Sequence, residues 1–61
     1  MKRYCCYLLD DEGRVSAREV LEGSHENEVF GMAQGYLAQH PSMPTVEVWQ
    51  EDRYLGKIHR H

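Results

Sequence analysis

The chain has 61 residues, of which 41% are hydrophobic and 28% are charged, a composition typical of one small globular domain. Seven basic residues against ten acidic ones give a formal net charge of -3, which disfavours an extended phosphate-binding surface. The longest apolar run, Tyr4 to Leu9, is shorter than a secretory signal and far below the roughly 18 residues of a membrane span. We therefore expect a single domain over residues 1–61, located in the cytoplasm and without a membrane partner.

Cys5 and Cys6 are the two cysteines of the chain, and they are adjacent in a segment that reads as extended. Neighbouring side chains of a strand point to opposite faces, so these two thiols cannot bond to each other. The second cysteine pair that a zinc site of the usual spacing needs is absent. Small secreted domains usually carry several disulfides, so the low count favours an intracellular protein whose thiols act as small hydrophobic groups.

The first part of the chain predicts a β-hairpin. Residues 3–9 are aromatic and apolar, and they end at Asp10-Asp11-Glu12-Gly13, a cluster typical of a turn. Residues 15–21 then alternate imperfectly between apolar and polar side chains, as a half-exposed strand does. Gly23 and Ser24 end this second strand.

A helix is predicted from about His25 to Gln39 or His40, with Ser24 as its N-cap. Glu26 and Glu28 place negative charge in the first turn, where the helix dipole favours it, and Pro41 ends the pattern. Six apolar residues recur at the helical period: Val29, Phe30, Met32, Ala33, Tyr36 and Leu37. Such a stripe predicts packing on a sheet rather than contact with a cofactor.

Two further strands are predicted, Thr45 to Gln50 and Arg53 to Ile58, on either side of the turn Glu51-Asp52. The order β-β-α-β-β indicates an α+β fold with a single four-stranded antiparallel sheet and one helix on one face. The first strand is apolar on both faces and the third is the next most apolar, so both belong in the centre. The predicted spatial order of the strands is therefore 2-1-3-4.

Strand alternation then assigns side chains to the two faces of this sheet. We expect Leu9 to pair with Arg14 across the first turn, and Gln50 with Arg53 across the second. This register places one set under the helix: Tyr4, Cys6, Leu8, Val15, Ala17, Val46, Val48 and Leu55. It places another set on the opposite face: Cys5, Tyr7, Leu9, Ser16, Arg18, Trp49, Tyr54 and Ile58.

The second face predicts an interaction surface, because one helix covers only one side of a sheet and large exposed apolar patches usually mark a partner. Aromatic residues and arginine are the types enriched at interface hot spots. The residues expected to make the contact are Tyr7, Leu9, Arg18, Trp49, Tyr54 and Ile58. A domain this small buries little surface alone, which favours a homodimer, with another protein as the other possible partner.

A single-stranded nucleic-acid binder is the alternative function. It would stack bases on Tyr7, Trp49 and Tyr54, with Arg3, Arg18 and Lys57 near the phosphates. The acidic balance and the lack of an RNP-like glycine-aromatic motif disfavour it. No catalytic or cofactor motif is found, so we expect no enzyme activity, no cofactor and no metal.

Two weaker sequence signals are a pair of glycines in the predicted helix and a pair of histidines at the chain end. Gly31 and Gly35 lie four apart on the predicted outer side of the helix, where they either are tolerated surface glycines or allow close packing of two helices. His59 and His61 form an H-x-H at the chain end, a poor metal site because it offers two ligands where the chain frays.

The stretch RYCCYLLDDEGRV, a helix led by glutamate, and the stretch VEVWQEDRYLGKI together resemble a group of short uncharacterised bacterial proteins, known chiefly from alphaproteobacteria. These share an aromatic first strand, an acidic turn and a closing strand pair built on Val-Trp. The resemblance extends over nearly the whole chain and implies the β-β-α-β-β fold and a bacterial origin. Members of the group have alanine-rich helices, from which Gly31 and Gly35 depart. The resemblance implies no activity and no site residues.

Overall fold

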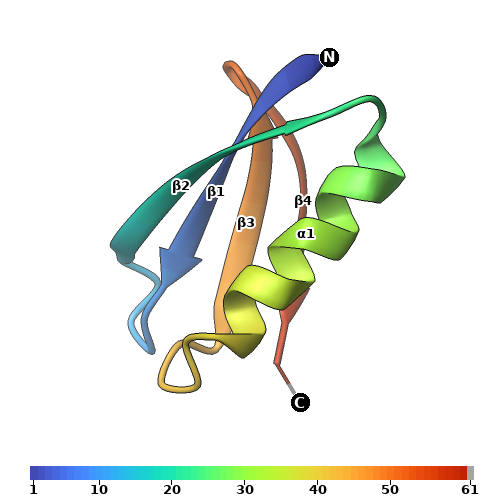
Figure 1. Ribbon diagram of the computed structural model, residues 1–61. Coiled ribbons are helices and arrows are strands. Elements are labelled where there is room, and N and C mark those ends of the chain that lie inside the picture. Colours follow the sequence, from blue (N-terminus) through green and yellow to red (C-terminus); the bar gives the residue numbers. More distant parts are fainter. Residues whose placement is uncertain (61) are drawn as a thin grey trace.

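The structure is a computed structural model that describes residues 1–60. Its elements are β1 (Lys2–Leu9), β2 (Val15–Gly23), α1 (Glu26–Ala38), β3 (Thr45–Gln50) and β4 (Arg53–His59). All strand pairs are antiparallel and lie in the order β2-β1-β3-β4, with α1 across one face of the sheet (Figure 1). The predicted fold and strand order are confirmed. Within residues 1–60, α1 is too short to cross a membrane.

The core lies between α1 and the face of the sheet that α1 covers. Val29, Ala33 and Leu37 follow each other at intervals of four, so they share one side of the helix and are buried. Eight apolar residues are no more than 4% exposed: Tyr4, Cys6, Leu8, Val29, Ala33, Leu37, Val46 and Val48. Met32, at the border of the predicted stripe, is 41% exposed instead.

The helix N-cap is His25, not the predicted Ser24. The Nδ1 atom of His25 accepts the backbone N–H of Glu28 at 3.3 Å. In return, the backbone N–H of Ser24 donates to Oε1 of Glu28 at 2.8 Å. Glu28 thus accepts from the residue before the cap rather than from the cap itself, as it would in a standard capping box, and the two bonds together tie Ser24 and His25 to the first turn of α1.

The first turn is closed by the carboxylate of Asp10. Its Oδ1 accepts the backbone N–H of Glu12 at 2.9 Å and that of Arg14 at 3.0 Å. The hydrogen bond from Arg14, assisted by the one from Glu12, lowers the pKa of Asp10 although the side chain is exposed. The backbone N–H of Asp10 also donates to the carbonyl of Arg14 at 2.9 Å, so Arg14 belongs to the turn rather than to the strand ladder.

A β-bulge in the first hairpin moves Val15 to the uncovered face. Leu9 pairs with Val15 and not with the predicted Arg14. Leu8 pairs with Ala17, whereas the predicted register places Val15 opposite Leu8. The register shifts between Leu8 and Leu9, so one extra residue of β2 stands opposite β1. The placement of Val15 under the helix is therefore wrong, and its side chain is 59% exposed.

A second bulge moves Ile58 in the other direction. Gln50 pairs with Arg53 as predicted, but the register shifts between Val48 and Trp49, and Ile58 then pairs with Val46. Ile58 consequently packs against the core and does not belong to the uncovered face, where the sequence had placed it.

Gly56 accounts for the second bulge. Its φ of 156° is a conformation that side chains with a Cβ rarely adopt, and a Cβ there would lie 3.3 Å from Cζ of Phe30. The missing side chain therefore lets the Phe30 ring of α1 approach β4 closely. A glycine inside a strand pattern is a known sign of a bulge or of a close approach.

Candidate interaction face

We call the side of the sheet opposite α1 the outer face. Residues paired across neighbouring strands point to the same side, so the observed registers define its members. From β1 and β2 these are Arg3, Cys5, Tyr7, Leu9, Val15, Arg18, Val20 and Glu22. From β3 and β4 they are Thr45, Glu47, Trp49, Tyr54, Lys57 and His59. Within residues 1–60 no element covers this face (Figure 1).

Five of the six residues predicted to make contact lie together on the outer face: Tyr7, Leu9, Arg18, Trp49 and Tyr54. The sixth, Ile58, lies on the covered face because of the second bulge. The prediction also missed Val15 and Val20, which are 59% and 46% exposed on this side. Their exposure extends the apolar surface across β2.

Three aromatic rings form the centre of the outer face. The centroids of Tyr7 and Trp49 lie 6.4 Å apart with the rings at 88°, and those of Trp49 and Tyr54 lie 5.3 Å apart at 61°. Each edge-to-face contact contributes roughly 0.5–1.5 kcal/mol beyond simple burial. The indole N–H of Trp49 also donates to Oε1 of Glu47 at 3.2 Å. Trp49 is therefore held in place on both sides before any partner binds.

An open hollow of about 310 Å³ lies beside these rings. Its lining combines apolar side chains with carboxylates: Tyr7, Val15, Trp49, Glu47, Glu51 and Asp52. Aromatic faces and carboxylates both attract cations, so this acidic-aromatic hollow suits a guanidinium or an ammonium group.

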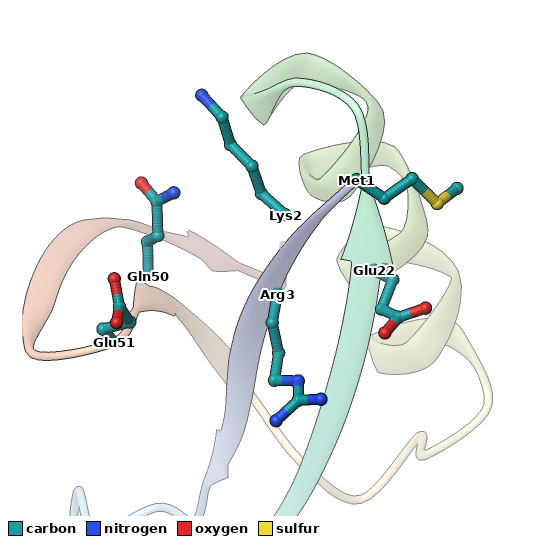
Figure 2. A pocket seen from close by; sticks show the side chains of 6 residues that line it. All are labelled: Met1, Lys2, Arg3, Glu22, Gln50 and Glu51. Atoms are coloured by element: carbon teal, nitrogen blue, oxygen red, sulfur yellow. The ribbon is translucent and has the colours of Figure 1, made fainter.

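A second, larger hollow of about 490 Å³ lies at the end of the sheet beside the N-terminus. Figure 2 shows its six lining side chains, from Met1, Lys2, Arg3, Glu22, Gln50 and Glu51. Lys2 and Arg3 point in opposite directions, and Met1 and Glu22 lie on the other side of them from Gln50 and Glu51 (Figure 2). This hollow therefore lacks the converging polar groups of a ligand site.

The charged residues of the outer face carry both signs. Arg3 pairs with Glu22 across β1 and β2, and Glu47 pairs with Lys57 across β3 and β4. Arg18, paired with Tyr7, is exposed. The ion pairs found within residues 1–60 join Arg14 to Glu12 and Arg53 to Glu26, so neither involves an outer-face residue.

No group of three or more histidine, cysteine or acidic side chains within residues 1–60 is arranged to hold a metal ion. The Nδ1 atom of His59 is instead hydrogen-bonded to Oγ1 of Thr45, at 2.7 Å. The other histidine of the H-x-H pattern, His61, lies outside the described residues.

The two cysteines have different environments. Cys6 is fully buried in the core, whereas Cys5 is half-buried on the outer face, where it pairs with Val20 and Trp49. Burial, reinforced by the nearby Cys5 and Glu19, raises the pKa of the Cys6 thiol to about 11. A thiol in the unfolded chain ionises at lower pH, so deprotonation favours unfolding. The buried, protonated Cys6 thiol therefore makes its full contribution to the free energy of unfolding at neutral pH, and this contribution is lost as the pH rises through about 11.

The first prediction concerns these thiols. At pH 8, and at a protein concentration well below the Kd of any self-association, iodoacetamide is expected to alkylate Cys5 and to leave Cys6 unmodified in the folded protein, because the reagent attacks an accessible thiolate. Mass spectrometry of digested protein measures both sites, and alkylation in denaturant provides the control in which both react. Equal modification of the two cysteines in the folded protein would contradict the assigned faces of β1.

Comparison of the chain with known protein families, with curated proteins and with solved structures finds no match. The resemblance to short alphaproteobacterial proteins therefore stays a prediction.

Proposed function

We propose that this chain is a small protein-interaction module that forms a homodimer through its outer face. The observation that carries the proposal is the aromatic cluster of Tyr7, Trp49 and Tyr54 at the centre of an uncovered sheet face. Tyr54 is 47% exposed and Val20 46%, so a layer placed there would bury further apolar area. Each Å² removed from water is worth about 25 cal/mol.

The dimensions of the molecule also favour a second layer on this face. The chain measures 31 × 21 × 15 Å, so the faces of the sheet are its broad surfaces. A standard interface buries about 800 Å² per partner, roughly a fifth of the 4188 Å² of surface that this chain exposes. Two such sheets would pack face to face about 10 Å apart, so each sheet would be covered by α1 on one face and by the second copy on the other.

The charges favour a second copy over a nucleic acid. The outer face carries three basic residues, Arg3, Arg18 and Lys57, against Glu22 and Glu47, so two copies meet with little net repulsion. A single strand whose bases stacked on the aromatic cluster would instead bring its phosphates near the carboxylates of Glu47, Glu51 and Asp52. The proposed partner is therefore a protein, and specifically another copy of this chain.

The proposal includes a cytoplasmic location. Cys5 and Cys6 are free, and Cys5 is partly accessible. Free thiols persist in a reducing compartment. In a bacterium, the origin that the resemblance implies, this compartment is the cytoplasm.

The second prediction tests the dimer. Wild-type protein at about 100 μM is expected to sediment as a dimer, because this concentration lies well above the Kd of about 1 μM that an 8 kcal/mol interface has. Trp49→Glu is expected to sediment as a monomer with an unchanged circular dichroism spectrum, since the new charge lies outside the core. Sedimentation equilibrium measures the mass. Gln34→Glu, on the exposed side of α1, is the matched control and should stay dimeric.

Three results would contradict the proposal. A wild type that is monomeric at this concentration would exclude the homodimer, and a dimeric Trp49→Glu would move the interface elsewhere. If Trp49→Glu lowers stability, Tyr54→Glu tests the same face at a more exposed position. A change in Trp49 fluorescence on titration with a single-stranded oligonucleotide, in wild type that stays monomeric, would favour the alternative function.

A further inference from the structure

We infer that Arg18 of each copy enters the acidic-aromatic hollow of the other copy and contacts Glu47 there. This inference rests on the proposed homodimer and specifies its geometry. It follows from the order in which charges and rings lie across the outer face.

Arg18, Tyr7 and Glu47 form one row across three neighbouring strands. Tyr7 of β1 pairs with Arg18 on β2 and with Glu47 on β3. Neighbouring strands lie about 4.8 Å apart, so the backbones of Arg18 and Glu47 are equally distant from Tyr7, on opposite sides of it. Two sheets packed face to face can be related by a two-fold axis that runs parallel to β1, midway between the sheets. This rotation brings β2 of one copy over β3 of the other, and it leaves each residue at the same height along the strand direction. Arg18 therefore lies over Glu47 of the second copy, and Glu47 lies over Arg18 of the second copy.

The same axis also brings complementary side chains together in the neighbouring row of the sheet. Cys5 pairs with Val20 on β2 and with Trp49 on β3. The rotation places Val20, 46% exposed, over Trp49 of the second copy. Apolar side chains thus meet apolar ones in one row while opposite charges meet in the next, and Tyr7 and Cys5 meet their own copies. Arg3, the next outer-face residue of β1, also lies over its own copy, but at the exposed end of the sheet, where Glu22 pairs with it.

Other two-fold axes bring like charges together. An axis along β3 would place Glu47 over Glu47 of the second copy. An axis midway between β1 and β3 would place Arg18 over Lys57, which pairs with Glu47 on β4. An axis across the strands at the level of Tyr7 would place Arg18 over Arg18. Each of these three arrangements brings like charges together in the middle of the outer face, whereas the axis along β1 does so only at the exposed end of the sheet, at Arg3. We therefore favour the axis along β1 over these three.

The chemistry of the hollow suits a guanidinium group. Oε1 of Glu47 already accepts the indole N–H of Trp49, which fixes the carboxylate and leaves Oε2 for a partner. The rings of Tyr7 and Trp49 line the same hollow, and Glu51 and Asp52 add negative charge at its end. Arginine pairs with carboxylates and stacks on aromatic rings, and Arg18 takes part in neither of the ion pairs found within residues 1–60.

Reciprocal charge reversal tests this geometry. Arg18→Glu alone would face Glu47 with a glutamate, and Glu47→Arg alone would face Arg18 with an arginine, so each variant is expected to dimerise at least tenfold more weakly. In an equimolar mixture, however, the heterodimer restores both opposite-charge contacts. Its Kd is expected to return to within about threefold of the wild-type value. Native mass spectrometry distinguishes the heterodimer by mass, and sedimentation measures the Kd values.

Control variants separate this inference from the dimer itself. Arg14→Glu reverses an exposed arginine in the first turn and should dimerise like wild type. Because Glu47 pairs with Lys57, Glu47→Arg adds a like-charge neighbour. Glu47→Gln, which removes the charge without this repulsion, therefore provides a second measurement and should also weaken the dimer.

The outcomes distinguish the two proposals. If wild type is dimeric and the reversed variants dimerise as tightly, the Arg18–Glu47 contact is wrong although the dimer stands. If both variants weaken the dimer but their mixture does not recover, the two residues are not partners, and the inference is again overturned. A monomeric wild type removes the homodimer and, with it, the contact.

Discussion

Leu8→Ala is expected to lower the free energy of unfolding by about 2–5 kcal/mol, whereas Leu9→Ala, one residue further along β1, is expected to cost much less. Leu8 is fully buried in a central strand, between Ala17 on β2 and Val46 on β3. Truncation there removes apolar contacts and leaves a cavity under α1. A domain of this length is stable by roughly 3–9 kcal/mol, so this loss is a large fraction of the total and the Leu8 variant should unfold at a much lower urea concentration than wild type.

Leu9→Ala is the matched control, because it makes the same chemical change on the half-buried outer face. Urea unfolding followed by circular dichroism measures both variants. The protein is kept at one low concentration, since dimerisation would add stability by mass action. Equal losses for the two variants would contradict the difference in burial between Leu8 and Leu9, and a larger loss for Leu9 would mean that the faces of β1 are assigned the wrong way round.

The sequence was sufficient to predict the architecture of this protein because each element carries a local signal of its own. The apolar period of 3.6 in α1, the turn residues and the greater apolarity of β1 and β3 all favour the same strand order, which the structure confirms. The buried side of the helix was also correctly predicted at Val29, Ala33 and Leu37.

Register was harder to predict, since strand alternation gives no signal of a bulge until the strand is paired. Two bulges, each adding one residue, reversed the faces of Val15 and Ile58 although neighbouring pairs such as Gln50–Arg53 were correct. One bulge had a visible signal, Gly56 inside a strand pattern, because glycine tolerates the unusual φ. The other lies beside Asp10, whose hydrogen bonds to the turn place Arg14 outside the ladder.

The candidate site was only partly predictable for a different reason. The aromatic residues were singled out individually, but the sequence assigned no role to the carboxylate of Glu47 beside them. Glu47 matters because its position next to Trp49 and in the row of Arg18 depends on pairing across three strands. Such a row is a property of the folded sheet and has no counterpart in local sequence.

The glycines of the chain provide the last prediction, because one substitution has opposite effects at two positions. Gly23 is buried where β2 ends, and a Cβ there would lie 2.7 Å from Cγ2 of Val29 and 2.8 Å from Oε1 of Glu28. Neither side chain can shift easily to make room for this Cβ, because Val29 is fully buried in the core and Oε1 of Glu28 accepts the N–H of Ser24. Gly31, in contrast, has open space around the position of its missing Cβ.

Gly23→Ala is therefore expected to lower the free energy of unfolding by about 1–3 kcal/mol, through overpacking at the start of α1. Gly31→Ala is expected to raise it by about 0.5–1 kcal/mol, because alanine is a better helix former and meets no obstacle. Urea unfolding of both variants measures the difference in sign. Stabilisation by Gly23→Ala would show that α1 and β2 pack less tightly than the structure indicates. Loss of the dimer in Gly31→Ala would instead move the interface from the outer face of the sheet to the exposed side of the helix.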